Sequence, residues 1–385
     1  MHAYLDSGRL NRLRTARATT QSDLAAQLNT SVSLLNRIES GHQQVDDETA
    51  VRLAHALDCS TDVLGRPLPD QLYTRPWLRA YADAPKKTVD EYVADTLLAM
   101  EFIGQLHLRR IPERLPLFDG DPNNDDDIEE FALEVREEAG VDPVKWVPNV
   151  TRAAERLGCV VLPLDSELGK HLGMSMHVDG VSVLRASRPA PGGGVPGDRQ
   201  RFTLAHELGH VTMHATWPPP GTAEQAKAIE KQAHRFAGAF LLPGDAFLSD
   251  LEALGGRVTL TTLANLKGRW GVAIKAMVVR LQNLGRIDAD QARSLYKQIS
   301  ARGWNKNEPV TVGNERAVWM KQALERRFLG DADALSAAVQ QCGLGRSYFE
   351  SWVSWEPLSS LDADVLDLSA RRRSGALPKG SRDRR

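Results

Sequence analysis

The run His206-Glu207-Leu208-Gly209-His210 constrains this 385-residue chain more than any other feature. Two histidines four positions apart on a helix lie one turn above each other, so their imidazoles can bind one metal ion. Residues around the run are apolar at helical spacing, which predicts a buried helix. Two solvated histidines would give the same motif, but buried histidines and a buried Glu are costly unless they pair or bind a metal. Glu207 would then act as the general base of a metallopeptidase.

A catalytic zinc site needs a third protein ligand and one open coordination position. Residues 222–242 follow a Pro-rich turn and have apolar side chains at three- and four-residue steps, as an amphipathic helix does. Glu230 lies in this segment, and we expect it to complete a Zn²⁺ site with His206 and His210. Glu224 is the rival carboxylate, but its surroundings are less apolar.

Two further histidines lie close to this predicted centre in the sequence. His234 follows Glu230 by four residues and is either the acceptor of a ligand histidine's outer N–H or a structural residue. His214 continues the histidine series by one more turn, about 5 Å along the axis, which is too far to share the metal. We interpret His214 as structural or substrate-facing. An Arg, His or Tyr from 171–177 or 269–280 is expected to stabilise the oxyanion.

The chain resembles the ImmA/IrrE family of metallopeptidases in two runs, RFTLAHELGHVTMH and EKQAHRFAGAFLLP. The resemblance covers about residues 126–300 and implies a zincin-like domain with a small sheet. His234 stands where Asn or Asp is commoner in the family. The resemblance implies that His206, His210 and Glu230 are the zinc ligands. It also implies that Glu207 is the catalytic residue. Several family members cleave a helix-turn-helix repressor during stress or mobile-element transfer, which implies a protein substrate of that class.

Strands are expected ahead of this motif. Residues 160–162 form a short buried run, and the two segments that flank Asp179-Gly180 alternate in the manner of a β-hairpin. An exposed strand edge can hold a peptide by strand addition, so the hairpin is a candidate substrate edge as well as a structural one. The Pro- and Gly-rich run 189–197 is predicted to be a mobile loop beside the site.

The first 68 residues carry a second signal, because five short helical segments with a tight turn between the second and third form a helix-turn-helix. They resemble the Cro/C1-type (XRE) DNA-binding domain, whose third helix enters the major groove. The resemblance implies double-stranded operator DNA as a partner. The residues expected to contact DNA are Gln21, Ser31, Val32, Ser33, Asn36 and Arg37.

The charge of this region is unusual for a DNA-binding domain. Residues 1–66 hold seven Arg and no Lys against eight Asp or Glu, a net charge of −1. DNA-binding domains usually have a basic face, since phosphate neutralisation supplies much of the affinity. A local basic patch is expected only on the first helix, from Arg9, Arg12, Arg14 and Arg17. The alternative is a helix-turn-helix domain that makes protein contacts only.

We expect an α+β, mostly helical chain with a five-helix N-terminal domain, a zincin-like domain with a small sheet, and C-terminal helices. The predicted ranges are 1–68 for the helix-turn-helix domain, 69–125 for a helical connector and acidic linker, 126–300 for the peptidase domain, 301–369 for a C-terminal helical region and 370–385 for a basic disordered tail.

The connector contains a predicted helix that opens with a capping box at Thr88 to Glu91 and runs to about Arg110. It would pair with its copy in a homodimer or, equally well, pack on its own peptidase domain. The acidic run 119–127 is predicted to be a solvated linker.

The composition is 42% hydrophobic and 25% charged, which is ordinary for a soluble globular protein. No run of eighteen apolar residues and no signal peptide is present, so we expect no membrane association. The three cysteines are far apart, which argues against a disulfide framework. A cytoplasmic location is expected.

The sequence leaves two functions open. The first is a zinc-dependent endopeptidase and transcriptional regulator. The second is a non-proteolytic regulator, or an antitoxin, whose zincin domain senses a ligand or metal. The intact motif favours the enzyme, because a pure sensor does not need the base Glu207.

Overall fold

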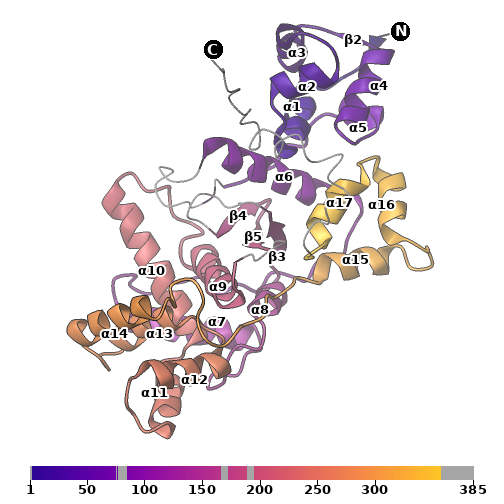
Figure 1. The fold of residues 1–385 in the computed structure, drawn as a ribbon. Coiled ribbons are helices and arrows are strands. Elements are labelled where there is room, and N and C mark those ends of the chain that lie inside the picture. The colour runs from indigo at the N-terminus through magenta and orange to yellow at the C-terminus, as the bar shows by residue number, and fades with distance from the viewer. Residues whose placement is uncertain (1, 75, 77–84, 166–171, 189–194, 357–385) are drawn as a thin grey trace, which may run out of the picture.

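The computed structural model describes residues 2–74, 76, 85–165, 172–188 and 195–356 (Figure 1). The chain is mostly helical, with one three-stranded sheet and a short two-stranded pair, which confirms the expected α+β fold. The predicted basic tail lies outside the described residues, as does most of the predicted mobile loop.

The N-terminal domain has five short helices whose first residues are preceded by side-chain caps. The caps are Asp6, Thr20, Ser31, Asp46 and Ser60, and each accepts a hydrogen bond from a backbone N–H of the following turn. The helices are α1 (Ser7–Ala16), α2 (Gln21–Gln27), α3 (Val32–Glu39), α4 (Asp47–Ala56) and α5 (Thr61–Gly65). Strands β1 (His2–Ala3) and β2 (Val45–Asp46) pair beside them. The second and third helices form the predicted helix-turn-helix.

Helix α6 (Lys86–Gln105) lies between this domain and the sheet (Figure 1). The predicted capping box was wrong: Pro85 is the N-cap, and the N–H of Thr88 already bonds to the Pro85 carbonyl. The helix also ends earlier than expected, because His107 adopts a left-handed backbone conformation with φ 52°. Most apolar side chains of α6 are buried within the chain, so the packing is intramolecular.

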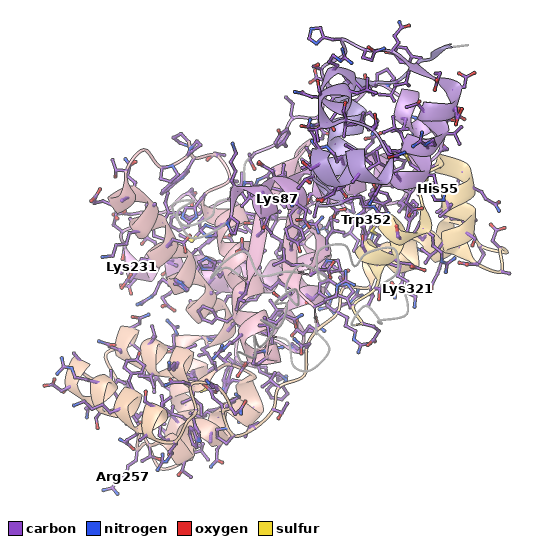
Figure 2. The ribbon with its side chains drawn as sticks, turned by 45° about the horizontal axis from the view of Figure 1, so that its top comes forward. His55, Lys87, Lys231, Arg257, Lys321 and Trp352 are labelled. Carbon is purple, nitrogen blue, oxygen red and sulfur yellow. The ribbon has the colours of Figure 1, made fainter. Side chains whose placement is uncertain are left out.

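The C-terminal helices bind back onto the N-terminal domain. They are α15 (Trp319–Arg327), α16 (Ala334–Cys342) and α17 (Arg346–Val353). The Tyr348 hydroxyl donates to the Leu57 carbonyl at 3.1 Å. The Trp352 indole donates to Asp95 on α6 at 3.0 Å, at the junction seen in Figure 2. These contacts connect the C-terminal helices to the end of α4 and to α6.

The sheet separates two buried apolar clusters. Its strands β3 (Val160–Leu164), β4 (Gly173–Val178) and β5 (Val181–Ser187) have the order β3-β5-β4. Strand β5 pairs parallel to β3 and antiparallel to β4. Asp179 and Gly180 join β4 to β5 with φ values of 50° and 75°, so the predicted hairpin is confirmed. One face of the sheet packs on α6, and the other packs on α9 (Gly197–Met213).

The remaining helices belong to the apolar cluster on the α9 side of the sheet. They are α7 (Asp125–Glu138), α8 (Val150–Arg156), α10 (Ala223–Leu241), α11 (Gly244–Ala253), α12 (Leu260–Trp270), α13 (Ile274–Asn283) and α14 (Ala289–Ala301). The predicted acidic linker was too long, because α7 begins at Asp125. Three acids occupy its first turn, where the helix dipole favours negative charge. Within the described ranges, no helix combines the length and apolar character needed to cross a bilayer.

Candidate active site

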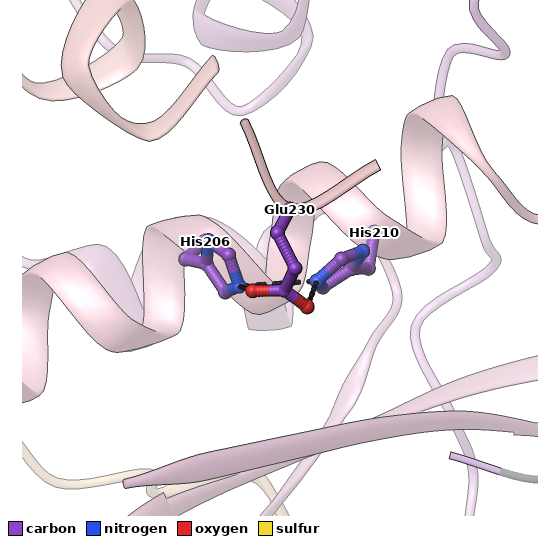
Figure 3. A group of neighbouring side chains, drawn as sticks. All are labelled: His206, His210 and Glu230. Carbon is purple, nitrogen blue, oxygen red and sulfur yellow. Dashed lines mark hydrogen bonds and ion pairs between the residues drawn. The ribbon is translucent and has the colours of Figure 1, made fainter. Parts of the chain in front are cut away.

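Three side chains from two neighbouring helices converge at one point, as Figure 3 shows. The Nε2 atoms of His206 and His210 on α9 are 3.0 Å apart. Each lies 3.5 Å from a carboxylate oxygen of Glu230 on α10. A tetrahedral zinc with bonds of about 2.0–2.1 Å separates its ligand atoms by about 3.3 Å. Two imidazole nitrogens and a carboxylate in this arrangement fit a zinc ion, whereas Glu224 is exposed and is not part of the group.

The close approach of α9 and α10 depends on Gly209. A Cβ at this position would lie 2.9 Å from Cδ1 of Phe236 on α10. Any other residue type would therefore collide with the Phe236 ring and crowd the Cα of Ala233, so the contact between α9 and α10 would have to shift. The start of α9 is held in turn by buried ion pairs of Asp198 with Lys267 and of Arg201 with Glu315.

The two imidazoles lower the pKa of the Glu230 carboxyl group. Burial by itself raises the pKa of this carboxyl group, but hydrogen bonds and charge from His206 and His210 outweigh it and lower the pKa below its ordinary value. Glu230 is therefore ionised, which is the form that binds a metal.

Glu207 lies in the same turn as His206 and contacts strand β4. Its carboxylate accepts a 2.6 Å hydrogen bond from the Ser175 hydroxyl. A Cβ at Gly173 would lie 3.0 Å from the Glu207 Cγ, so the strand begins directly against this side chain. Burial raises the pKa of Glu207 to about 7, against the opposing effects of His206 and Ser175. A carboxylate with this pKa exchanges protons readily near neutral pH.

The predicted DNA-contacting residues of α3 are on the surface. Ser31, Val32, Ser33, Asn36 and Arg37 are all exposed at its start or along its outer face. Gln21 is partly buried. Its side-chain amide donates to Glu39 at 2.7 Å, so in this structure the amide group serves an internal contact.

The predicted basic patch on α1 was wrong. Arg9 is fully buried and makes a bidentate ion pair with Glu101 of α6, at 2.6 and 2.7 Å. The other three arginines also have partners within the chain: Arg12 bonds to Gln71, Arg14 to Glu39 and Arg17 to Asp58. The number of arginines on α1 did not reveal these internal contacts, because the partner residues are up to 92 positions away in the sequence.

The comparisons with known proteins bear on these two regions. Residues 194–282 match the peptidase family described as the IrrE N-terminal-like domain, and residues 10–64 match the helix-turn-helix family. The chain therefore carries one segment similar to each of these two families. The expected resemblance is thereby confirmed. A search of the curated proteins found no match.

In the IrrE-like domain, sequence reasoning missed the contact that His214 makes. Its Nδ1 lies 3.2 Å from Nδ1 of His210, and its Nε2 lies 3.1 Å from Oε1 of Gln232 on α10. Burial and the neighbouring His210 lower the pKa of His214 to about 3, so its ring is neutral. The available signal was the four-residue spacing of His206, His210 and His214, which also places neighbouring rings within reach of each other.

The expected hydrogen bond between a ligand histidine and His234 does not form. The two rings of His234 and His206 pack with centroids 4.5 Å apart. The Nδ1 of His206 is buried without a hydrogen-bond partner in the described part of the chain.

The described candidates for an oxyanion-stabilising group have other partners or positions. Arg280 bonds to Glu129, and Arg269 bonds to Asp250. His177 lies at the far end of β4, and His171 lies outside the described residues.

Proposed function

We propose that the chain is a zinc-dependent endopeptidase and transcriptional regulator, which binds operator DNA and cleaves a repressor-type protein of the helix-turn-helix class in a stress or mobile-element response. The observation that carries the proposal is the position of Glu207. Its carboxylate is buried beside the cluster of His206, His210 and Glu230 and is bonded to the edge strand β4.

The residues of this site have distinct tasks in peptide hydrolysis. Zinc held by His206, His210 and Glu230 would supply a Lewis acid that acidifies water and polarises the peptide carbonyl. Glu207 accepts a proton from the attacking water and passes it to the leaving nitrogen, so the C–N bond breaks to give a neutral amine. Ser175 binds one carboxylate oxygen of Glu207 and thereby orients the carboxylate for this transfer.

Strand β4 offers an edge for an extended peptide. His177 directs its backbone groups outward: its N–H donates to the Thr74 hydroxyl at 2.9 Å, and its carbonyl accepts from the Thr74 N–H at 3.0 Å. Backbone groups alternate in direction along a strand, so Ser175 and Gly173 also face outward. The edge that we assign to the substrate therefore already accepts one extended segment of the same chain.

Among the residues that the structure describes, this internal segment contacts the end of β4 that is remote from Glu207. Tyr73 bridges Val178, and Pro76 has no N–H with which to continue the ladder toward Ser175. In the described part of the chain, no backbone hydrogen bond to another segment is made by Ser175 on the outer side. The end nearest Glu207 is thus the position for a substrate peptide.

DNA binding is supported by the packing of the N-terminal domain, which leaves α3 exposed. Helix α1 packs on α6, and α4 and α5 are contacted by the C-terminal helices, while α3 lies at the outer end of the molecule (Figure 1). Arg37 and Asn36 supply the base-reading groups on α3. Because the α1 arginines serve internal contacts, we expect a modest affinity. Binding at the operator would bring the peptidase to a repressor seated there.

The test combines zinc analysis with incubation of the protein and helix-turn-helix repressors encoded nearby. Glu207→Gln should retain stoichiometric zinc and lose cleavage by at least about 10²-fold, because general base catalysis contributes this much or more. Glu224→Gln, an exposed change at the start of α10, should cleave as the unchanged protein does. Undiminished cleavage by Glu207→Gln would refute the mechanism. Metal-dependent DNA binding that persists in that variant, with no cleavage by either protein, would establish the sensor function instead.

A further inference from the structure

We infer that His214 and Gln232 form a relay that fixes the orientation and tautomer of His210, so that its Nε2 is presented to the metal. This inference rests on the metal centre of the proposed function. It assigns His214 and Gln232 as positioning residues, because neither reaches the point where the three ligand side chains converge.

Two contacts link His210 to α10 through His214. The Nδ1 atoms of His210 and His214 are 3.2 Å apart, and the Nε2 of His214 is 3.1 Å from the Gln232 side-chain oxygen. The relay therefore links the outer nitrogen of a ligand on α9 to α10, the helix that carries Glu230. His214 is also the C-cap of α9, and its backbone N–H bonds to the His210 carbonyl at 3.0 Å.

The Gln232 oxygen determines which nitrogen of each ring carries a proton. An amide oxygen only accepts, so the Nε2 of His214 donates to Gln232 and its Nδ1 accepts. The proton between the two rings then belongs to Nδ1 of His210, which leaves the Nε2 lone pair of His210 available to a metal ion. The opposite amide orientation would reverse both hydrogen bonds and place the His210 proton on Nε2, where it would block metal binding. Only one direction of the relay is compatible with a ligand role.

The outer nitrogens of the two ligand histidines differ in their hydrogen bonding. The ring of His214 is fully buried, so each of its nitrogens needs a partner. The corresponding outer nitrogen of His206 is buried without a hydrogen-bond partner in the described residues. Of the two ligand imidazoles, His210 is the one that the protein holds by its outer nitrogen, so loss of the relay should loosen that ligand specifically.

The experiment measures zinc affinity by competition with a chromogenic chelator, at one fixed pH, for the full chain. His214→Phe and Gln232→Leu each break the relay and should weaken zinc binding by about 10- to 100-fold, which is the usual effect of losing such a partner. His214→Gln keeps an amide oxygen that can accept from His210 and should stay within about threefold of the unchanged protein. Thr212→Val removes a buried hydroxyl on the same turn, which bonds to the Leu208 carbonyl, and serves as the matched control.

Two further readouts separate positioning from general stability. Thermal unfolding of the metal-free proteins reports the structural cost of each change, and the absorption spectrum of the Co²⁺-substituted protein reports the geometry of the ligands. Zinc affinity in Gln232→Leu and His214→Phe equal to that of Thr212→Val would overturn the relay, even if stability falls. If His214→Phe does not fold, Gln232→Leu decides. Failure of the unchanged protein to bind zinc would overturn the metal centre itself, whereas zinc binding without cleavage would leave the relay standing and refute only the peptidase.

Discussion

Ser175 on β4 donates a 2.6 Å hydrogen bond to Glu207 on α9, so the strand proposed to hold the substrate also holds the proposed base. We expect Ser175→Ala to lower kcat for the cleaved substrate by about 10- to 100-fold, because a hydrogen bond to a charged group is worth about 1.5–3 kcal/mol. Zinc content should not change. The control is Ser182→Ala on the neighbouring strand β5, which removes a buried hydroxyl that donates to Glu113. Equal rates for the two variants would show that Ser175 does not orient the base.

Gly209 sets the distance between the two helices that carry the metal ligands. Gly209→Ala should destabilise the protein by about 1–3 kcal/mol, as overpacking does, and should weaken zinc binding, because the added Cβ displaces α10 and with it Glu230. Gly238→Ala on α10 is the matched change, since its Cβ would lie 3.6 Å from the nearest atom and the helix gains about 0.5–1 kcal/mol. Urea unfolding and chelator competition measure both effects. Zinc affinity that is unchanged in Gly209→Ala would contradict the role given to this glycine.

Glu91 on α6 makes the stability of the chain depend on pH. Burial, reinforced by Asp95, raises the pKa of Glu91 to about 7 from an ordinary value of 4.5. Lys87 and Arg185 oppose the shift and Asp165 adds to it. The unfolded chain releases this proton at lower pH than the folded chain does, so stability falls as pH rises from about 4.5 to 7 and is constant above that range.

Glu91→Gln should remove this contribution. Relative to the variant, the unchanged protein should lose on the order of 1–3 kcal/mol between about pH 5 and about pH 8. Urea unfolding of both proteins at the two pH values measures the difference. Parallel pH profiles would mean that Glu91 titrates normally in the folded chain.

Substitutions of two arginines in the N-terminal domain should separate an effect on stability from an effect on DNA binding. Arg9→Met leaves the Glu101 carboxylate buried without its ion-pair partner and should cost about 3–5 kcal/mol of stability. Arg37→Ala on exposed α3 should change stability by less than about 0.5 kcal/mol and weaken operator binding by about 1–3 kcal/mol. Thermal unfolding and a mobility shift on the chain's own promoter test the pair. Operator affinity that is unaffected by Arg37→Ala would favour the protein-contact interpretation of this domain.

Local patterns in the sequence were sufficient for the elements themselves. The spacing of His206 and His210, the apolar stripe on both sides of Glu230 and the turn at Asp179-Gly180 each depend on residues within one helix or one hairpin. The periods of 3.6 and 2 residues therefore predicted where these helices and strands form. The capping box at Thr88 failed because Pro85 begins the helix one turn earlier without any side-chain cap.

Contacts between distant segments were decided by the tertiary structure alone. The pairing of Arg9 with Glu101 turned an expected DNA-binding patch into an internal ion pair, and packing of α9 on α10 joined His214 to Gln232. The pairing of Tyr73 with β4 likewise depends on where the connector lies against the sheet. The sequence by itself determined which chemical groups each element carries. Only the folded chain decided which of them meet, because burial and hydrogen bonding depend on neighbours that no sequence period records.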